Sequence, residues 1–485
     1  MGASGKTFPS ASHPEMRLDK GAFPMAKTNI VFILADDMGY GDVGRFGNDA
    51  VETTALDSIA SNGLQLMQHY AGSPVCAPSR AALMTGRYPH RTGAIDTFEG
   101  RGLDRLALRE TTIADLLKAG GYATGIMGKW HLGALDPRYH PNRRGFDEFV
   151  GFRGGWSDYY RWRLDCNETF RKADGRYLTD VFTDEAVQFI ERHRDEPFFL
   201  HVTYNAPHFP FQVVEEDAEP FRESGQLDEG VCLIYAMNRR LDGGVGRIME
   251  TLRLHGLEQN TLVIFTSDNG PQLGTTKDGL NVRRFNGGFA GSKGFVYEGG
   301  IRVPAVLQWP AGLPGDARAC SDLIHFTDWL PTLLAVAGID QPENLRFDGM
   351  NVLPVLRGES RQTNERRFWQ WNRYVPVASS NASMRDGPWK IIRPRIAETM
   401  KLDPHEAEFD ARLKNDPDSV SDIRRDPFPE RHIPDPPPPL LFNVEEDPFE
   451  QNDLADQKPH IVSRMQRELD NWFEEVEAER RTIHD

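Results

Sequence analysis

The sequence predicts an α/β protein that carries a smaller α+β unit at its C-terminal end. Continuous apolar runs, which are typical of strands buried on both faces, alternate with helical patterns as far as about residue 340. After about residue 365 two short runs, at 367–374 and 389–393, indicate antiparallel strands, and residues 460–479 form a final amphipathic helix. Strands that alternate with helices indicate a mainly parallel sheet covered by helices.

We expect three regions along the chain. Residues 1–26 are polar and interrupted by three prolines, and would form an N-terminal arm. Residues 27–364 would form the main α/β domain, and residues 365–485 the C-terminal α+β domain. Within the latter, residues 396–439 are charged and rich in proline, which predicts an exposed insertion rather than a core element.

Charge and cysteine content narrow the classes of partner. The formal net charge of −16 argues against a nucleic acid or an anionic membrane as partner, so an anionic ligand would need a local cationic pocket. No apolar run approaches the length of a membrane span, and the N-terminus shows no apolar signal region. The four cysteines show no Cys-x-x-Cys pair, which fits a reducing compartment. We therefore expect a cytoplasmic protein.

Helical patterns separate the expected strands, and several of them stop at a glycine. We expect these helices at residues 55–62, 111–119, 179–195, 228–255 and 328–337, the fourth interrupted at Gly243 and Gly244.

The first apolar run, residues 28–35, ends in Asp36 and Asp37. Ligands of open parallel sheets lie beyond the carboxyl ends of the strands. Two adjacent carboxylates repel each other there unless a cation joins them. A solvated turn is the alternative interpretation of this pair.

Three further strand ends carry polar residues. The run 122–127 leads to Lys129 and His131, the run 197–204 leads to His208, and the run 261–267 leads to Asp268 and Asn269. The oxygen ligands that Asp36, Asp37, Asp268 and Asn269 offer favour calcium or magnesium over zinc. Each histidine or lysine alone is also compatible with a core or solvated role.

The chain is organised around residues 73–87. Pro78 is expected as the first residue of a short helix that Gly86 closes, which places Cys76 at the mouth of a helix N-terminus, where an anion or a developing negative charge is favoured. Arg80 is unusual, because a cation in the first turn opposes the helix dipole. The alternative is that Cys76 is a small buried hydrophobe and Arg80 a surface cation.

Two other segments point to ligand binding. Lys293 lies in a glycine-dense loop, residues 286–304, where backbone can approach a ligand closely. Residues 151–162 combine glycine, aromatic residues and arginine, and form either a packing loop or a wall for an aryl or sugar ring.

The pattern Cys76-x-Pro78-Ser79-Arg80, followed by Leu83-x-Thr85-Gly86-Arg87, resembles the modification signature of type I sulfatases. The stretch from Gly128 to Gly133, which contains Lys129 and His131, resembles the second signature of that family. The resemblance spans roughly residues 28–310 and, weakly, the stretch 440–448. It implies an alkaline-phosphatase-like three-layer α/β/α sandwich with a smaller C-terminal α+β domain.

The resemblance also implies roles for residues of this chain. Cys76 would be converted by a maturation enzyme to formylglycine, whose hydrate attacks sulfur. A calcium ion, in preference to Mg²⁺ or Mn²⁺, would be held by Asp36, Asp37, Asp268, Asn269 and the modified Cys76. Arg80 would steady the hydrate, and Lys129 would hold both the hydrate and a sulfate oxygen. His131 would take the proton of the second hydroxyl, and His208 and Lys293 would bind sulfate and help to protonate the departing alcohol. Ser157 is a looser match for a further hydrogen bond to sulfate.

The expected activity is hydrolysis of sulfate monoesters, either aryl sulfates or sulfated sugars. Two alternatives remain open: a formylglycine hydrolase of the same superfamily that prefers phosphonate or phosphate esters, and a binding protein for anions or glycans in which Cys76 is never converted. We expect loops 151–162, 272–290 and 396–439 to select the alcohol. The N-terminal arm and the insertion are the candidates for contact with a second copy in a homo-oligomer.

Overall fold

The computed structural model describes residues 1–2, 27–315, 317–361, 366–416 and 419–485. Most of the expected N-terminal arm and the expected boundary at residues 364 and 365 lie outside the described residues.

A ten-stranded sheet forms the centre of the molecule, in the order β10-β2-β9-β8-β1-β7-β3-β4-β5-β6. Its five central strands, from β8 to β4, run parallel, and β9, β5 and β6 are antiparallel to their neighbours. The strands are β1 (Asn29–Ala35), β2 (Leu64–Tyr70), β3 (Ala123–Lys129), β4 (Glu148–Phe152), β5 (Arg163–Cys166), β6 (Thr169–Lys172), β7 (Phe198–Thr203), β8 (Thr261–Ser267), β9 (Ala305–Gln308) and β10 (Arg318–His325).

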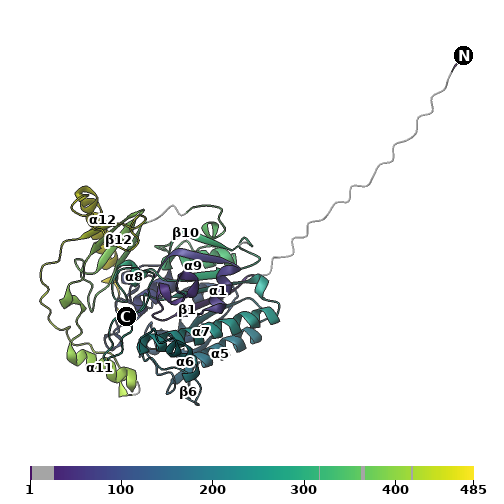
Figure 1. Cartoon of the computed structure of the whole chain (residues 1–485), viewed down its shortest axis with the longest axis horizontal. Coiled ribbons are helices and arrows are strands. Elements are labelled where there is room, and N and C mark those ends of the chain that lie inside the picture. The colour runs from purple at the N-terminus through teal and green to yellow at the C-terminus, as the bar shows by residue number, and fades with distance from the viewer. Residues whose placement is uncertain (3–26, 316, 362–365, 417–418) are drawn as a thin grey trace.

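Helices cover both faces of this sheet (Figure 1). Ile30, Phe32 and Leu34 of β1 pack into one core with α2 (Cys76–Thr85), α4 (Ile113–Ala119) and α9 (Trp329–Ala337). The alternate residues of β1 pack into the other core with α1 (Thr54–Ser61), α5 (Leu178–Arg192) and α7 (Glu229–Leu254). A strand whose two faces are both apolar is thereby buried on both sides, as the continuous run predicts, and the result is a three-layer α/β/α sandwich.

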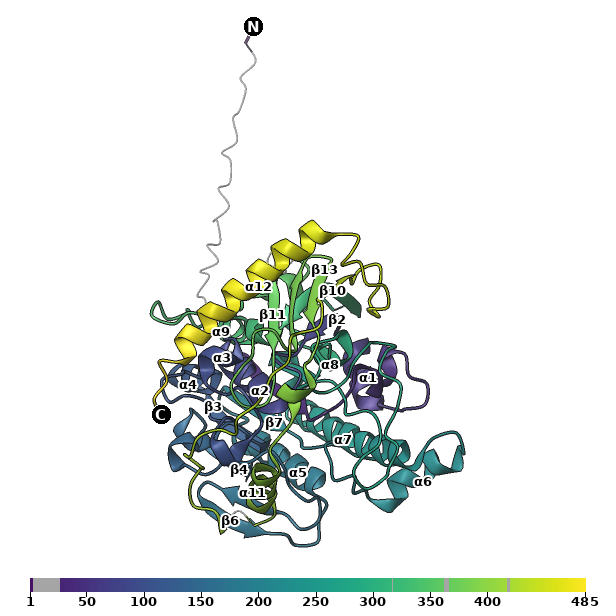
Figure 2. The ribbon, with the colours of Figure 1, turned by 90° about the vertical axis from the view of Figure 1, so that its left-hand side faces the viewer.

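A second, antiparallel sheet follows, formed by β11 (Arg367–Gln370), β12 (Ala382–Asp386), β13 (Trp389–Arg393) and β14 (Leu440–Asn443). Figure 2 shows α12 (Pro459–Arg480) lying across this sheet, where its apolar face contacts Met384 and Ile391. The other face of the small sheet packs through Trp369 and Ile392 against Tyr70 and Ile301 of the main unit. The predicted α+β appendage is confirmed. The remaining helices are α3 (Pro89–Thr92), α6 (Glu215–Glu223), α8 (Glu298–Ile301), α10 (Leu353–Leu356) and α11 (Pro404–Asn415).

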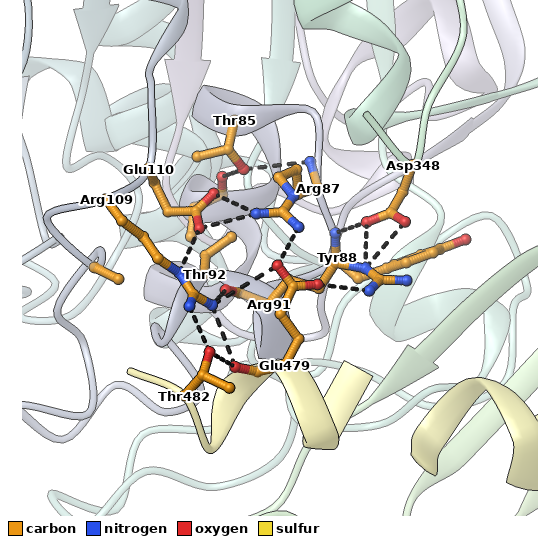
Figure 3. Close-up of polar contacts among 12 residues, drawn as sticks. Thr85, Arg87, Tyr88, Arg91, Thr92, Arg109, Glu110, Asp348, Glu479 and Thr482 are labelled. Atoms are coloured by element: carbon orange, nitrogen blue, oxygen red, sulfur yellow. Dashed lines mark hydrogen bonds and ion pairs between the residues drawn. The ribbon is translucent and has the colours of Figure 1, made fainter. Parts of the chain in front are cut away.

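A cluster of ion pairs fastens the end of α12 to the segment around α3. Figure 3 shows three arginines, Arg87, Arg91 and Arg109, gathered with the acids Glu110, Asp348 and Glu479. Arg87, the last residue of the motif stretch, donates to Glu110 at 2.9 Å and also pairs with Glu479. Arg87 therefore links the main unit to helix α12 of the C-terminal unit.

Two local predictions are wrong. The helix α2 begins at Cys76, two residues before Pro78, and the first hydrogen bond of the helix runs from the N–H of Ser79 to the carbonyl of Val75. Pro78 is tolerated because the first N–H groups of a helix have no intrahelical partner. Helix α7 continues through Gly243 and Gly244. A Cβ on Gly244 would lie 2.5 Å from Oγ1 of Thr183, so this glycine allows close packing of α7 on α5.

The segment 396–439 is only partly the exposed insertion that the composition predicts. Its proline run is largely exposed, but α11 contributes the buried residues Glu406 and Leu413. Glu406 accepts two hydrogen bonds from Nε of Arg101, each at 3.0 Å. The Glu406–Arg101 pair holds the insertion against the main unit. The sequence shows that the segment is charged, but it does not show which of its acids has a buried partner.

All four cysteines are free thiols. In the described part of the chain, no helix has the length and apolar character needed to span a bilayer.

Candidate active site

The carboxyl ends of β1, β3 and β8, together with the turn after β7, bring the predicted polar residues to one edge of the main sheet. Asp36 and Asp37 follow β1, Asp268 and Asn269 follow β8, Lys129 ends β3, and His208 lies beyond β7. Asp37 and His131 adopt left-handed backbone conformations, with φ of 65° and 56°. Such angles are uncommon for residues other than glycine and occur where surrounding structure holds the chain in place.

Three carboxylates pair with three cations at this edge. Nζ of Lys129 lies 2.6 Å from Oδ2 of Asp36, Nη2 of Arg80 lies 2.8 Å from Oδ2 of Asp268, and Nζ of Lys293 lies 2.7 Å from Oδ1 of Asp37. Asp36 and Asp37 therefore do not form a solvated turn.

Burial and charge act in opposite directions on these carboxylates. Burial alone would raise the pKa of Asp36, but Lys129, His208 and Arg80 hold it well below its ordinary value. Burial, with the negative charge of Asp36, raises the pKa of Asp268 to about 7. The pKa of Asp37 is lowered, because Lys293 and His208 outweigh its burial.

Arg80 and Cys76 are both buried, each with 3% of its surface exposed. Arg80 donates from Nε to Asp268 at 2.9 Å and from Nη1 to the carbonyl oxygen of Lys129 at 3.0 Å, so it is not a surface cation. Its carboxylate partner explains a buried positive charge near the N-terminus of α2, although Arg80 lies just beyond the first turn because the helix begins at Cys76. Burial raises the pKa of the Cys76 thiol.

The donor set fits a hard divalent cation. Ligand atoms of Asp36, Cys76 and Asp268 lie within 4.8 Å of one another, and so do those of Asp36, Asp37 and His208. Among the described residues, the buried oxygens Oδ1 of Asp36 and Oδ1 of Asn269 have no hydrogen-bond partner. Nδ2 of Asn269 donates to Asp37 at 2.8 Å, which leaves the amide oxygen to serve as a ligand. Carboxylate and amide oxygens are ligands that calcium and magnesium prefer.

The two histidines of the site differ in their hydrogen bonds. Nε2 of His131 lies 3.3 Å from the carbonyl oxygen of Thr97, which can only accept, so Nε2 carries the proton and Nδ1 is an acceptor. This Nδ1 is buried and has no partner in the described part of the chain. His208 donates from Nδ1 to the carbonyl oxygen of Phe209 at 2.6 Å, and its Nε2 lies 3.8 Å from Asp37. Burial and then Lys293 lower the pKa of His208 to about 4, and burial holds the pKa of His131 well below its ordinary value.

A cavity of about 300 Å³ opens above this cluster. Cys76, His131, His208 and Lys293 line it, together with Thr97 and residues that the sequence interpretation missed: Trp371, Arg373 and Lys414. Trp371 and Arg373 follow β11, and Lys414 lies in α11, so part of the lining comes from the C-terminal unit. The sequence marked the segment 396–439, which contains Lys414, as one that selects the alcohol, but no motif singled out any of these three residues, which lie hundreds of positions from Cys76.

Ser157 is not part of this cavity. Its hydroxyl donates to the carbonyl oxygen of Asp158 at 3.2 Å and lines an adjoining cavity of about 830 Å³. Residues of the loops 151–162 and 396–439 line this larger cavity, whereas no residue of 272–290 lines either one.

Comparison with known proteins then identifies the family. Residues 28–339 match the family model described as Sulfatase. The chain belongs to the sulfatase family. Residues 288–430 also match the model of the C-terminal region of N-sulphoglucosamine sulphohydrolase. The predicted resemblance is confirmed.

Curated relatives cover most of this sulfatase. It is 34% identical to arylsulfatase G of Mus musculus over 374 residues, which cover 68% of this chain and 69% of that protein. It is also 34% identical to N-acetylgalactosamine-6-sulfatase of Canis lupus familiaris over 360 residues, 68% of this chain and 66% of that one. These relatives show that the chain is an enzyme that hydrolyses sulfuric esters.

Solved structures agree with this assignment. The crystal structure of Ps i-CgsB in complex with k-i-k-neocarrahexaose superposes with a TM-score of 0.77 and 31% identity, covering 92% of each chain. The phosphonate monoester hydrolase of Agrobacterium radiobacter, at 19% identity and a TM-score of 0.61, shares the fold. The fold of this sulfatase is alkaline-phosphatase-like, as the resemblance implied.

Proposed function

We propose that this sulfatase cleaves sulfate monoesters of sugars or aryl alcohols, with residue 76 in its formylglycine form and a calcium ion in the carboxylate cluster. One observation supports this proposal above the others. Sγ of Cys76, at the first residue of α2, lies within 4.8 Å of carboxylate oxygens of Asp36 and Asp268 and also lines the cavity. A reactive group at residue 76 would therefore face both a cation site and the space for a substrate.

An unmodified Cys76 is poorly suited to attack. Burial raises the pKa of its thiol, and the thiolate is the nucleophilic form. In the formylglycine form, residue 76 would supply a hydroxyl nucleophile, and a bound divalent cation would neutralise negative charge and lower the pKa of a nearby hydroxyl. We further propose that a maturation enzyme performs the conversion.

Asp36, Asp37, Asp268 and Asn269 would hold the cation. Three carboxylates and an amide oxygen favour calcium, because calcium takes six to eight oxygen ligands in flexible geometry. Magnesium usually keeps several waters and binds only one or two carboxylates. The partnerless oxygens of Asp36 and Asn269 support a cation at this position.

The remaining side chains divide the binding and proton-transfer roles. Lys293 lines the cavity with a side chain that is 21% exposed, so its ammonium can bind a sulfate oxygen, whereas the buried Lys129 pairs with Asp36. His208 directs Nε2 towards the site and would donate a proton to the departing alcohol oxygen once a sulfate anion raises its pKa. His131, with a neutral ring and an acceptor Nδ1, is suited to take a proton from the nucleophile's second hydroxyl.

Mass spectrometry of the peptide that contains Cys76 tests the proposal together with hydrolysis of 4-nitrophenyl sulfate. We expect the aldehyde mass in the wild type and loss of hydrolysis in Cys76→Ala, whereas Cys232→Ala, a matched buried cysteine, retains activity. An unmodified thiol in active protein would refute the formylglycine. Faster hydrolysis of a phenyl phosphonate monoester than of the sulfate would favour the phosphonate alternative.

A further inference from the structure

Two cations of the C-terminal unit line the small cavity without belonging to the sulfate-binding cluster. Arg373 lies three residues beyond the end of β11, and Lys414 lies in the last turn of α11. Their side chains are 26% and 30% exposed, respectively, so both reach the cavity and remain accessible. The three-layer fold supplies one wall of the cavity, and these residues supply another.

Arg373 is held in position by a buried acid. Its Nη1 donates to Oδ1 of Asp96 at 2.8 Å and to Oγ1 of Thr97 at 2.9 Å. Asp96 is fully buried and also accepts from the indole N–H of Trp371 at 3.3 Å. The guanidinium lies 5.2 Å from the centroid of the Trp371 ring. Among the described residues nothing accepts a hydrogen bond from Nε or Nη2 of Arg373, so these donors remain for a ligand.

Lys414 is paired on one side only. Its Nζ lies 2.7 Å from Oδ2 of Asp410, and an ammonium has two further N–H donors. Burial and the positive charge of Arg373 each lower the pKa of Lys414, but Asp410 and Glu99 outweigh them and keep it above its ordinary value. The lysine is therefore charged at neutral pH, and it faces the same cavity as Arg373.

Arg373 and Lys414 both face the same cavity, and each keeps N–H donors beyond those that its carboxylate partner accepts, so an anion in the cavity can accept hydrogen bonds from both cations. We propose that Arg373 and Lys414 form a second anion subsite of this sulfatase, which binds a carboxylate or a second sulfate on the sugar that carries the scissile ester. This inference rests on the proposed function, because the proposed function places the scissile sulfate at Lys293 and His208.

The cavity's size and its aromatic wall define the rest of the substrate class. A volume of about 300 Å³ is at the lower end of the range for ligand pockets and suits one sugar ring. Trp371 offers that ring a flat apolar surface. The sugar residue that occupies this cavity therefore carries two anionic substituents, of which one is the sulfate that is removed.

Competitive inhibition of 4-nitrophenyl sulfate hydrolysis tests this subsite. The probes share one scaffold: galactose 2-sulfate, galactose 6-sulfate, galactose 2,6-disulfate and galacturonate 2-sulfate, with the glucose series in parallel. The disulfate and the uronate separate a sulfate from a carboxylate as the second anion. The variants are Arg373→Met and Lys414→Met, and the matched control is Lys401→Met, a lysine of the same segment whose side chain is 72% exposed.

We expect a doubly charged probe to bind about tenfold or more tightly than its singly charged counterpart, as a charge-assisted hydrogen bond would give. This ratio is expected to fall to about threefold or less in both variants and to be retained in Lys401→Met. A purely structural role would weaken both kinds of probe equally and leave the ratio unchanged. A wild-type ratio near one in both sugar series, or a ratio retained in both variants, would overturn the subsite.

Failure of the proposed function is a separate result. If the wild type hydrolyses neither 4-nitrophenyl sulfate nor any of the sugar sulfates, the proposed function fails, and calorimetric titration of the same probes into Cys76→Ala protein still measures the ratio. Thermal unfolding of each variant shows whether it is folded.

Discussion

Replacing Arg367 by methionine tests how the small sheet is held to the main unit. Arg367 is the first residue of β11 and is fully buried, and its Nη2 donates to the two carboxylate oxygens of Asp328 at 2.9 and 3.1 Å. Asp328 is also fully buried and accepts from the backbone N–H groups of His325 and Met350, each at 2.9 Å. After the substitution, the Asp328 carboxylate would keep the hydrogen bonds from these two backbone N–H groups and lose those from the guanidinium.

The expected cost follows from this geometry. Removing one partner of a buried ion pair leaves an uncompensated charge and typically costs about 3–5 kcal/mol. An unfolding entropy of about 2.1 cal/mol/K per residue amounts to about 1 kcal/mol/K for this chain if it unfolds as one unit, so we expect the melting temperature to fall by about 3–5 °C. Urea unfolding, which measures the free energy directly, is the primary assay.

Arg366→Met is the matched control, because this neighbouring arginine is 55% exposed and pairs with Asp386 at the surface. A surface pair contributes about 1 kcal/mol or less. The variant Arg367→Met with Asp328→Asn removes both charges and is expected to recover part of the loss. A loss in Arg367→Met no larger than in Arg366→Met would refute the assignment of this pair as a buried anchor.

Three further predictions concern the metal site, a buried acid and the arginine cluster. Calcium at about 100 times its dissociation constant is expected to stabilise the folded protein by about 2.7 kcal/mol. We expect Asn269→Leu to lose most of this stabilisation. A thermal midpoint that neither calcium nor a chelator changes would contradict the metal site. Burial raises the pKa of the Asp242 carboxyl from 3.8 to about 6, so the folded protein binds the carboxyl proton more tightly than the unfolded chain does. The stability that Asp242 contributes therefore falls as pH rises from 3.8 to 6. In urea, the stability of the wild type relative to Asp242→Asn should therefore be greater at pH 4 than at pH 7, by at most about 3 kcal/mol, and equal differences would exclude this titration. Arg87→Met is expected to lower the free energy of unfolding by more than the roughly 1 kcal/mol of a surface pair, because its partner Glu110 is only 3% exposed. Glu475→Ala serves as the control, since Glu475 is 69% exposed. Equal losses in urea unfolding would show that the cluster is not an anchor.

Much of the site could be predicted because its residues follow buried strands. Successive side chains of a strand point to opposite faces of the sheet, so a continuous apolar run indicates burial on both faces. The carboxyl ends of parallel strands meet at one edge of the sheet. Asp36, Lys129 and Asp268 lie at the ends of such runs and come together in the structure, where Lys129 pairs with Asp36 and Arg80 lies between Asp36 and Asp268. The role of Cys76 as formylglycine, the identity of the cation, the cytoplasmic location and a homo-oligomer stay predictions.

Some local predictions failed because tertiary packing overrides local preference. Gly243 and Gly244 predict a break, but Gly244 lies against α5, where a side chain would clash, so the helix continues. Composition marked 396–439 as exposed, yet Glu406 finds Arg101 and α11 covers part of the main unit.

The sequence by itself determined the fold class, the family and the strand-end residues, because each depends on local period or on a motif of a few neighbouring positions. Only the tertiary structure decided which charges are paired and which residues close the cavity. Arg80 meets an acid 188 positions away, and Arg373 is held by an acid 277 positions away. The first contact depends on which strands and helices lie together in the main unit, and the second on how the small sheet packs against that unit. No local pattern along the chain records either arrangement.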